Sequence, residues 1–228
     1  LLRMGEKRVK KNPVITIDGP SGAGKSTVAR LLAEKLGIRY LDSGAIYRAV
    51  AYVLDKNGIP PEDGAELREA LSKLTIHMED GVITVNGKDV TDKIRTPYVS
   101  AIASRYSSLP VIRQSLLMIQ RQQVQKSGLV AEGRDMGTVV FPEADVKFYL
   151  IANDKVRAER RWKELREKGQ EVELDFIMDQ IQKRDNNDSS RKTAPLMAAE
   201  DAVIFDTSDL SIQEVIEGLA AIITSRPD

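Results

Sequence analysis

Several residue types are scarce in this chain, and each scarcity excludes a class of protein. The 228 residues include no cysteine and a single histidine, His77, so disulfide scaffolds, cysteine nucleophiles and Cys/His zinc sites are excluded. Lys+Arg and Asp+Glu both number 34, which gives a formal net charge of +0. That balance argues against broad electrostatic binding to nucleic acid or anionic lipid.

Long apolar runs are also missing. No run approaches the length of a membrane span, so no membrane partner is expected. The N-terminal stretch is basic but leads into only four apolar-leaning residues, 14–17, and this pattern is not that of a signal peptide. We therefore expect a cytoplasmic protein. With 42% hydrophobic and 30% charged residues, the chain has the composition of a globular protein.

Strand and helix patterns alternate along most of the chain. The apolar run VITID (14–18) stops at Gly19 and predicts a buried strand. Residues 25–36 then place Val28, Leu31, Leu32 and Leu36 on one helical face, ended by Gly37. Further strands are expected at 39–41, 129–132, 146–151 and 203–206, and further helices at 43–57, 111–126, 154–168, 174–184 and 212–224. This alternation predicts an α/β fold, with a parallel sheet and helices on both faces.

One segment departs from the alternation. The turn pairs Asp80-Gly81 and Asn86-Gly87 separate the short runs TIHME, VITV and KDV. Asp-Gly and Asn-Gly accept the positive φ angles of two-residue hairpins. The segment therefore predicts a small three-stranded antiparallel insertion.

A glycine-rich segment gives the first indication of chemistry. Residues 19–26 (GPSGAGKS) match G-x-x-x-x-G-K-[ST] between a predicted strand and a predicted helix, which is the P-loop context; the alternative is an ordinary glycine-rich turn. Its backbone N–H groups would surround phosphate oxygens, Lys25 would reach the β/γ-phosphates, and the Ser26 hydroxyl would ligate Mg²⁺. The residues expected to hold the phosphates of ATP are Gly19, Pro20, Ser21, Gly22, Ala23, Gly24, Lys25, Ser26 and Thr27.

A P-loop alone does not separate a GTPase, an ATPase and a small-molecule kinase. No N-K-x-D segment is present, which weakens the GTPase interpretation. Arginines cluster at or near the predicted element ends, and two phosphate groups meeting at one site need several planar donors. For any single arginine the alternative is a solvated surface charge. These arginines are Arg48, Arg113, Arg134, Arg157, Arg160, Arg161, Arg184 and Arg191.

Five segments together resemble one known family. They are GPSGAGKST, LDSGAIYR (41–48), EGRDMGTVVFP (132–142), KRDNNDSSR (183–191) and TAPL (193–196). In this order they are similar to bacterial cytidylate kinases over residues 13–223. The resemblance implies a P-loop nucleoside monophosphate kinase domain at 13–224 with a five-stranded parallel sheet. It also implies an acceptor-binding insertion at 59–105, which includes the antiparallel strands, and a lid at 154–172.

The resemblance also implies roles for individual residues. Arg48, Arg134 and Arg191 match a clamp on the acceptor phosphate, and Ser43 and Tyr47 match the lining of that pocket. The other expected CMP-binding residues are Ser104, Arg113 and Asp135 at the cytosine base, and Arg184 and Asp188 at the sugar.

The donor side carries the remaining assignments. Lys25 and the lid arginines Arg157 and Arg161 are the expected catalytic residues. Glu132 is a candidate partner of Mg²⁺ through water, beside Ser26, which stands where many relatives have glycine. Each polar residue also has a structural alternative, such as a helix-surface hydroxyl for Ser104, a turn for Asp135, a helix end for Asp188 or a strand end for Glu132.

The implied reaction is transfer of the γ-phosphoryl group of ATP to CMP or dCMP, which gives ADP and CDP or dCDP and requires Mg²⁺. The expected partners are these nucleotides alone, with no nucleic acid and no membrane, and the expected assembly is a monomer. Two alternatives remain open: a kinase for another small acceptor, such as UMP or a non-nucleotide alcohol, and a non-enzymatic nucleotide-dependent switch.

Overall fold

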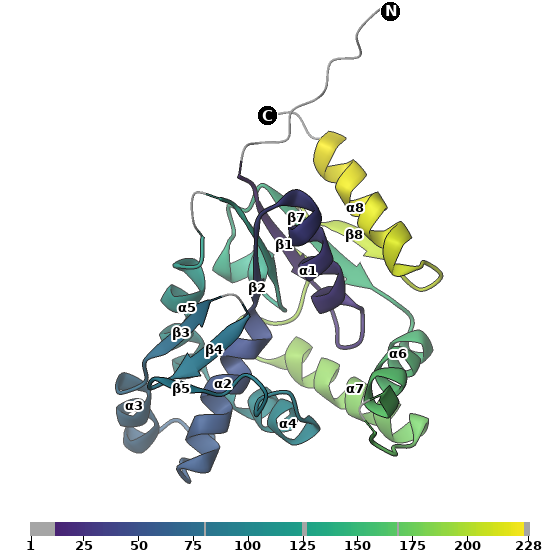
Figure 1. Ribbon diagram of the computed structural model, residues 1–228. Helices are drawn as coiled ribbons and strands as arrows, with labels where there is room; N and C mark the ends of the chain where they lie inside the picture. The colour runs from purple at the N-terminus through teal and green to yellow at the C-terminus, as the bar shows by residue number, and fades with distance from the viewer. Residues whose placement is uncertain (1–11, 80, 125–126, 168, 226–228) are drawn as a thin grey trace, which may run out of the picture.

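A parallel sheet forms the centre of the protein, shown in Figure 1 as a computed structural model that describes residues 12–79, 81–124, 127–167 and 169–225. Five parallel strands lie in the order β2-β6-β1-β7-β8. Their bounds are β1 (Val14–Asp18), β2 (Arg39–Asp42), β6 (Leu129–Glu132), β7 (Val146–Ile151) and β8 (Val203–Asp206). The predicted α/β class is confirmed. Because the strands are parallel, their carboxyl ends meet at one edge of the sheet.

Helices cover both faces of this sheet. One face packs against α1 (Lys25–Leu36) and α8 (Ile212–Ser225) (Figure 1). The core of the other face includes α2 (Ser43–Lys56) and α5 (Pro110–Arg121), and α4 (Pro97–Tyr106) packs against α2. Successive strand residues point to opposite faces. In β6, Val130 therefore joins the core under α1, whereas Leu129 and Ala131 join the core under α2.

The antiparallel insertion is present as predicted. It comprises β3 (Ile76–Glu79), β4 (Val82–Val85) and β5 (Lys88–Asp89), preceded by α3 (Ala65–Ser72). Asn86 and Gly87 have φ angles of 51° and 73°, as the hairpin turn requires. Asp80, the first residue of the other predicted turn, lies outside the described residues. Ile83 and Val85 pack into the α2 core and so fix the insertion to the main domain.

Two charged helices, α6 (Asp154–Glu167) and α7 (Leu174–Ser190), lie side by side near the carboxyl ends of the strands (Figure 1). They share a small core of their own, formed by Ala158, Leu165, Ile177 and Ile181. Within the part of the chain that the structure describes, no helix is long and apolar enough to cross a membrane.

Five local features differ from the sequence prediction. Helices α3 and α4 were not predicted, and neither was a π-helical turn, η1 (Met136–Val140). Helix α7 continues to Ser190, beyond the predicted end at 184. The polar run that follows Arg184 stays helical because Asp188 pairs with Arg134 on a distant segment. Helix α5 ends at Arg121, short of the predicted end at 126, and a turn follows at Gln122 and Gln123. The predicted helix end at 168 falls outside the described residues.

Candidate active site

The P-loop joins β1 to α1 at the carboxyl edge of the sheet. Gly19 and Gly22 have φ angles of 143° and 77°, where side chains are strained. A Cβ on Gly19 would lie 2.1 Å from the carbonyl oxygen of Leu150 in β7. The sequence therefore needs glycine here for close packing as well as for backbone conformation. The loop leads into the N-terminus of α1, where backbone N–H groups favour an anion.

Lys25, the first residue of α1, is buried, and its Nζ donates a hydrogen bond to the carbonyl oxygen of Pro20 at 2.6 Å. Burial, with the nearby positive charge of Arg134 as a second cause, lowers the pKa of Lys25 to about 7. The charge of a phosphate anion bound in the loop would therefore stabilise the ammonium form of Lys25.

A hydroxyl and a carboxylate meet beside the loop. The Oγ of Ser26 donates to Oε1 of Glu132 at 2.7 Å, because β6 and β1 are neighbours and Glu132 ends β6. Burial, and secondly the charge of Asp42, raise the pKa of Glu132. Oxygen donors of this kind suit Mg²⁺. Among the described residues no group of three or more His, Cys, Asp or Glu side chains could hold a metal alone, so a metal here would also need nucleotide oxygens.

A cleft of about 1300 Å³ extends from the P-loop to α2 and α4. It gathers most of the predicted site residues, although they come from distant parts of the chain. Of the predicted residues, Gly19, Pro20 and Arg157 do not line it. Those that do are Ser21, Gly22, Ala23, Gly24, Lys25, Ser26, Thr27, Ser43, Tyr47, Arg48, Ser104, Arg113, Glu132, Arg134, Asp135, Arg161, Arg184, Asp188 and Arg191.

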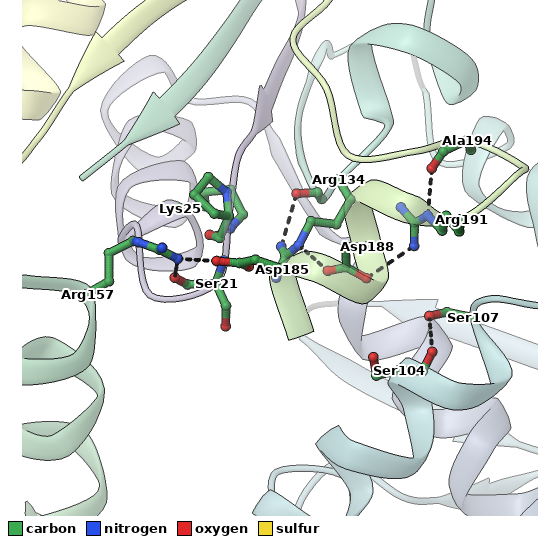
Figure 2. Close-up of polar contacts among 12 residues, drawn as sticks. Ser21, Lys25, Ser104, Ser107, Arg134, Arg157, Asp185, Asp188, Arg191 and Ala194 are labelled. Carbon is green, nitrogen blue, oxygen red and sulfur yellow. Dashed lines mark hydrogen bonds and ion pairs between the residues drawn. The ribbon is translucent and has the colours of Figure 1, made fainter. Parts of the chain in front are cut away.

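Arginines at the far side of the cleft are held by carboxylates. Arg48 pairs with Asp42 at 2.9 Å, and Arg134 pairs with Asp188 at 2.9 Å. Arg191 contacts the other oxygen of Asp188 at 3.4 Å, so that one carboxylate orients two guanidinium groups (Figure 2). Each guanidinium has five N–H donors, and these pairs use only some of them. The arginines are therefore oriented with donors left over for a ligand.

Several polar atoms of the residues that line the cleft are buried and unpaired within the described part of the chain. Ser104 Oγ, Arg184 Nε and Arg191 Nη2 have no hydrogen-bond partner among the described residues. Burial, and secondly the charge of Arg134, lower the pKa of Arg184 to about 10. Unpaired buried donors are costly, and such a group of cations and donors is satisfied by an anionic, oxygen-rich ligand.

A buried ion pair lies further along the cleft. Arg113 of α5 pairs with Asp135, which precedes η1, and its guanidinium lies 5.2 Å from the centroid of the Tyr47 ring. A second bond from Arg113 to the carbonyl oxygen of Ser107, at 3.2 Å, fixes its orientation. The cleft thus offers a donor-only and an acceptor-only group next to an aromatic ring.

The remaining predicted residues have distinct environments. Ser43 donates to the main-chain carbonyl of Glu132 at 2.7 Å, which ties α2 to β6. Arg161 lines the cleft and pairs with Glu164 at 2.7 Å. Arg157 is directed to Ser21 at the outer side of the P-loop (Figure 2).

Three acidic residues near the cleft were not among the predicted site residues. Asp42 caps α2 and pairs with Arg48. Asp18 accepts hydrogen bonds from the backbone N–H groups of Met136 (2.9 Å) and Gly137 (2.7 Å), and burial raises its pKa to about 7. Asp185 contacts both the P-loop and Arg157. The sequence signal for each was adjacency to a motif: Asp18 precedes Gly19, Asp42 precedes Ser43, and Asp185 follows Arg184.

A P-loop at the carboxyl edge of a parallel sheet, facing an arginine-lined cleft, defines a P-loop phosphotransferase. A family model described as cytidylate kinase matches residues 15–225. A cytidylate kinase from Geobacter sulfurreducens is 46% identical over 221 residues, which is 95% of this chain and 95% of that relative. One from Fervidobacterium nodosum is 47% identical over 212 residues, 93% of this chain and 96% of that relative. The chain belongs to the cytidylate kinase family, and the resemblance noted in the sequence is confirmed.

A solved structure agrees at the level of the fold. An uncharacterized protein from Eubacterium ventriosum superposes with a TM-score of 0.53 at 13% sequence identity, covering 94% of this chain and 100% of that chain. At this identity the likeness extends to the fold alone.

Proposed function

We propose that this chain transfers the γ-phosphoryl group of ATP to CMP or dCMP. The observation that carries the proposal, beside family membership, is the single cleft that joins the P-loop to the arginine cluster. A phosphate donor at one end and a phosphate acceptor at the other would meet between Lys25 and Arg134. Phosphoryl transfer depends mainly on such positioning and on charge neutralisation.

The donor end would hold the phosphates of ATP. The loop N–H groups and the Lys25 ammonium would contact their oxygens, and the loss of water around Lys25 strengthens that contact. Ser26 and Glu132 would hold the Mg²⁺ that accompanies the nucleotide, with Glu132 acting through water. When bound, Mg²⁺ neutralises charge on the β- and γ-phosphate oxygens.

The arginine end would hold the acceptor phosphate. Arg48, Arg134 and Arg191 are pre-oriented by Asp42 and Asp188, so binding would lose little side-chain entropy. The spare donor of Arg191 supports this assignment. Because the acceptor is a phosphate monoester that is largely ionised at neutral pH, its oxygen attacks without a general base.

The buried pair of Arg113 and Asp135 would read the base. Cytosine presents a 4-amino donor beside acceptors at N3 and O2, which matches a carboxylate and a guanidinium. Uracil presents an acceptor, O4, in place of the 4-amino group and a donor, N3–H, in place of the N3 acceptor, so its O4 would face the carboxylate. Ser104 and Tyr47 would complete the pocket, and Arg184 and Asp188 would meet the sugar.

The lid assignment at 154–172 remains a proposal. Arg161 faces the cleft from α6 and is the lid residue that would touch the transferring phosphoryl group. Arg157 remains a predicted catalytic residue, and its contacts with Ser21 and Asp185 favour an additional role.

An acceptor panel tests the proposed function. ADP release from Mg-ATP is measured with CMP, dCMP, UMP and a small alcohol acceptor, and the phosphorylated product is identified by ³¹P NMR. We expect turnover with CMP and dCMP to exceed turnover with UMP and the alcohol. A preference for UMP or the alcohol would identify another acceptor, and absence of turnover with every acceptor would indicate a nucleotide-dependent switch.

A further inference from the structure

Both backbone groups of Ser21 in the P-loop are held by side chains from the α6–α7 helix pair. The Ser21 N–H donates to Oδ1 of Asp185 at 2.9 Å, and the Ser21 carbonyl oxygen accepts from Nη1 of Arg157 at 2.8 Å. Asp185 and Arg157 also pair with each other, which closes a ring of three contacts (Figure 2). Ser21 is separated from Arg157 by 136 residues and from Asp185 by 164. A long-range arrangement therefore grips a single peptide segment of the loop.

The contacts of this ring are largely shielded from water. The side chains of Arg157 and Asp185 are 7% and 15% exposed, whereas Asp154, which also pairs with Arg157 at 2.6 Å, is 53% exposed. Charge-assisted hydrogen bonds are stronger when they are withdrawn from solvent, whereas exposed pairs contribute little. The Asp185 contact should therefore matter more than the Asp154 contact, although both involve the same guanidinium.

Backbone packing at the next residue supports the same arrangement. A Cβ on Gly22 would lie 2.8 Å from the carbonyl oxygen of Arg157 and 2.9 Å from its Cβ. The backbone of α6 therefore rests directly on the loop. The loop is held by packing at Gly22 and by hydrogen bonds at Ser21.

We infer that Asp185 is a positioning residue which, together with Arg157, clamps the P-loop at Ser21 and so holds the loop in its phosphate-binding conformation. The inference rests on the proposed function, because it assigns the clamp to the ATP side of that site. Asp185 acts through the loop and touches no substrate. Its helix α7 also carries Arg184 and Asp188, so the clamp sets the position of the loop relative to the arginine end of the cleft.

Another interpretation gives the opposite expectation. A carboxylate on a P-loop N–H group could simply occupy the place of a phosphate, and its removal would then strengthen ATP binding. If Asp185 is part of a clamp, its removal weakens ATP binding because the loop loses its conformation. The sign of the change in ATP affinity separates the two.

Titration calorimetry with Mg-ATP tests the clamp on Asp185→Asn, with Asp154→Asn as the matched control. Both substitutions remove one carboxylate charge from Arg157, but only Asp185 contacts the loop. We expect Asp185→Asn to raise the Kd for ATP about tenfold, and Asp154→Asn to stay within about twofold of wild type. An ATP Kd for Asp185→Asn that is unchanged or lower than wild type would overturn the inference.

A double-mutant cycle with Arg157→Gln tests whether the two residues act as a unit. If they do, the double variant binds ATP about as weakly as the more affected single variant, and independent, multiplicative effects would overturn the clamp. Because these measurements need no turnover, they stand even if CMP is not the acceptor.

One measurement requires neither a variant nor a ligand. In the wild-type protein without nucleotide, the Ser21 amide should exchange hydrogen slowly, since its N–H group has an acceptor in Asp185. Rapid exchange at Ser21 would overturn the clamp, including in the case that Asp185→Asn fails to fold.

Discussion

ATP binding should change the protonation of Lys25, and the size of the change follows from its surroundings. Burial, and secondly the charge of Arg134, lower the pKa of Lys25 to about 7. At pH 8 about one tenth of the molecules therefore carry the ammonium form. A phosphate charge at about 4 Å contributes roughly 4 kcal/mol at an effective dielectric constant of about 20, which raises the pKa by about three units. The bound protein should then be almost fully protonated at Lys25.

The expected uptake at pH 8 is thus about 0.9 proton per ATP bound. Binding favours the protonated form, so the apparent ATP affinity should fall as the pH rises above about 7. Titration calorimetry in buffers with different ionisation enthalpies measures the uptake directly. The Lys25→Arg variant, whose side chain stays charged, is the control and should show no uptake. An uptake below about 0.2 proton in wild type would refute the assigned environment of Lys25.

Three further predictions concern the cleft and its surroundings. Arg48→Ala, Arg134→Ala and Arg191→Ala should each weaken CMP binding by about tenfold or more, with smaller effects on ATP binding. The reason is that each substitution would remove a charge-assisted contact of roughly 1.5–3 kcal/mol. Titration with CMP checks this, and a wild-type CMP affinity in all three variants would contradict it. Gly22→Ala should abolish most ATP binding, because the φ of Gly22 is +77° and the added Cβ would meet Arg157. The control Gly37→Ala, at φ +65° with no atom within 4 Å of the added Cβ, should bind ATP normally. Equal ATP affinities of the two variants would be inconsistent with the packing of Arg157 on Gly22. A bisubstrate analogue should slow amide exchange in residues 154–167, because phosphates would hold inward the like charges of Arg160, Arg161 and Lys163, which line the cleft. Unchanged exchange would count against a closing lid.

The sheet could be predicted because its strands are short, apolar and followed by glycine or by helix signals. VITID before Gly19 illustrates this, since a buried parallel strand is apolar on both faces. Helix α4 was missed although Thr96 caps it and Pro97 occupies its first turn. Its apolar residues pack against α2, a contact that no local pattern reveals.

The residues of the candidate site also divide into those that a local motif predicts and those that only the folded chain reveals. Lys25 and Ser26 belong to a local motif whose geometry is set by neighbouring residues. Asp185 and Asp18 act through contacts with segments more than 100 residues away, so only the folded chain reveals them. The π-helical turn that follows Asp135 is likewise held by Asp18 from β1 and has no local sequence signal.

In the proposed function, the cleft accepts cytidine monophosphates and reads the base through Arg113 and Asp135. The most direct test is kcat/KM for CMP and for UMP, measured on wild type and on Asp135→Ala. A site built on buried hydrogen bonds discriminates strongly, so wild type should prefer CMP by at least about 10²-fold. Asp135→Ala should reduce activity with CMP more than with UMP and so compress that ratio. A wild-type ratio near one, or a ratio unchanged by Asp135→Ala, would mean that Arg113 and Asp135 do not read the base.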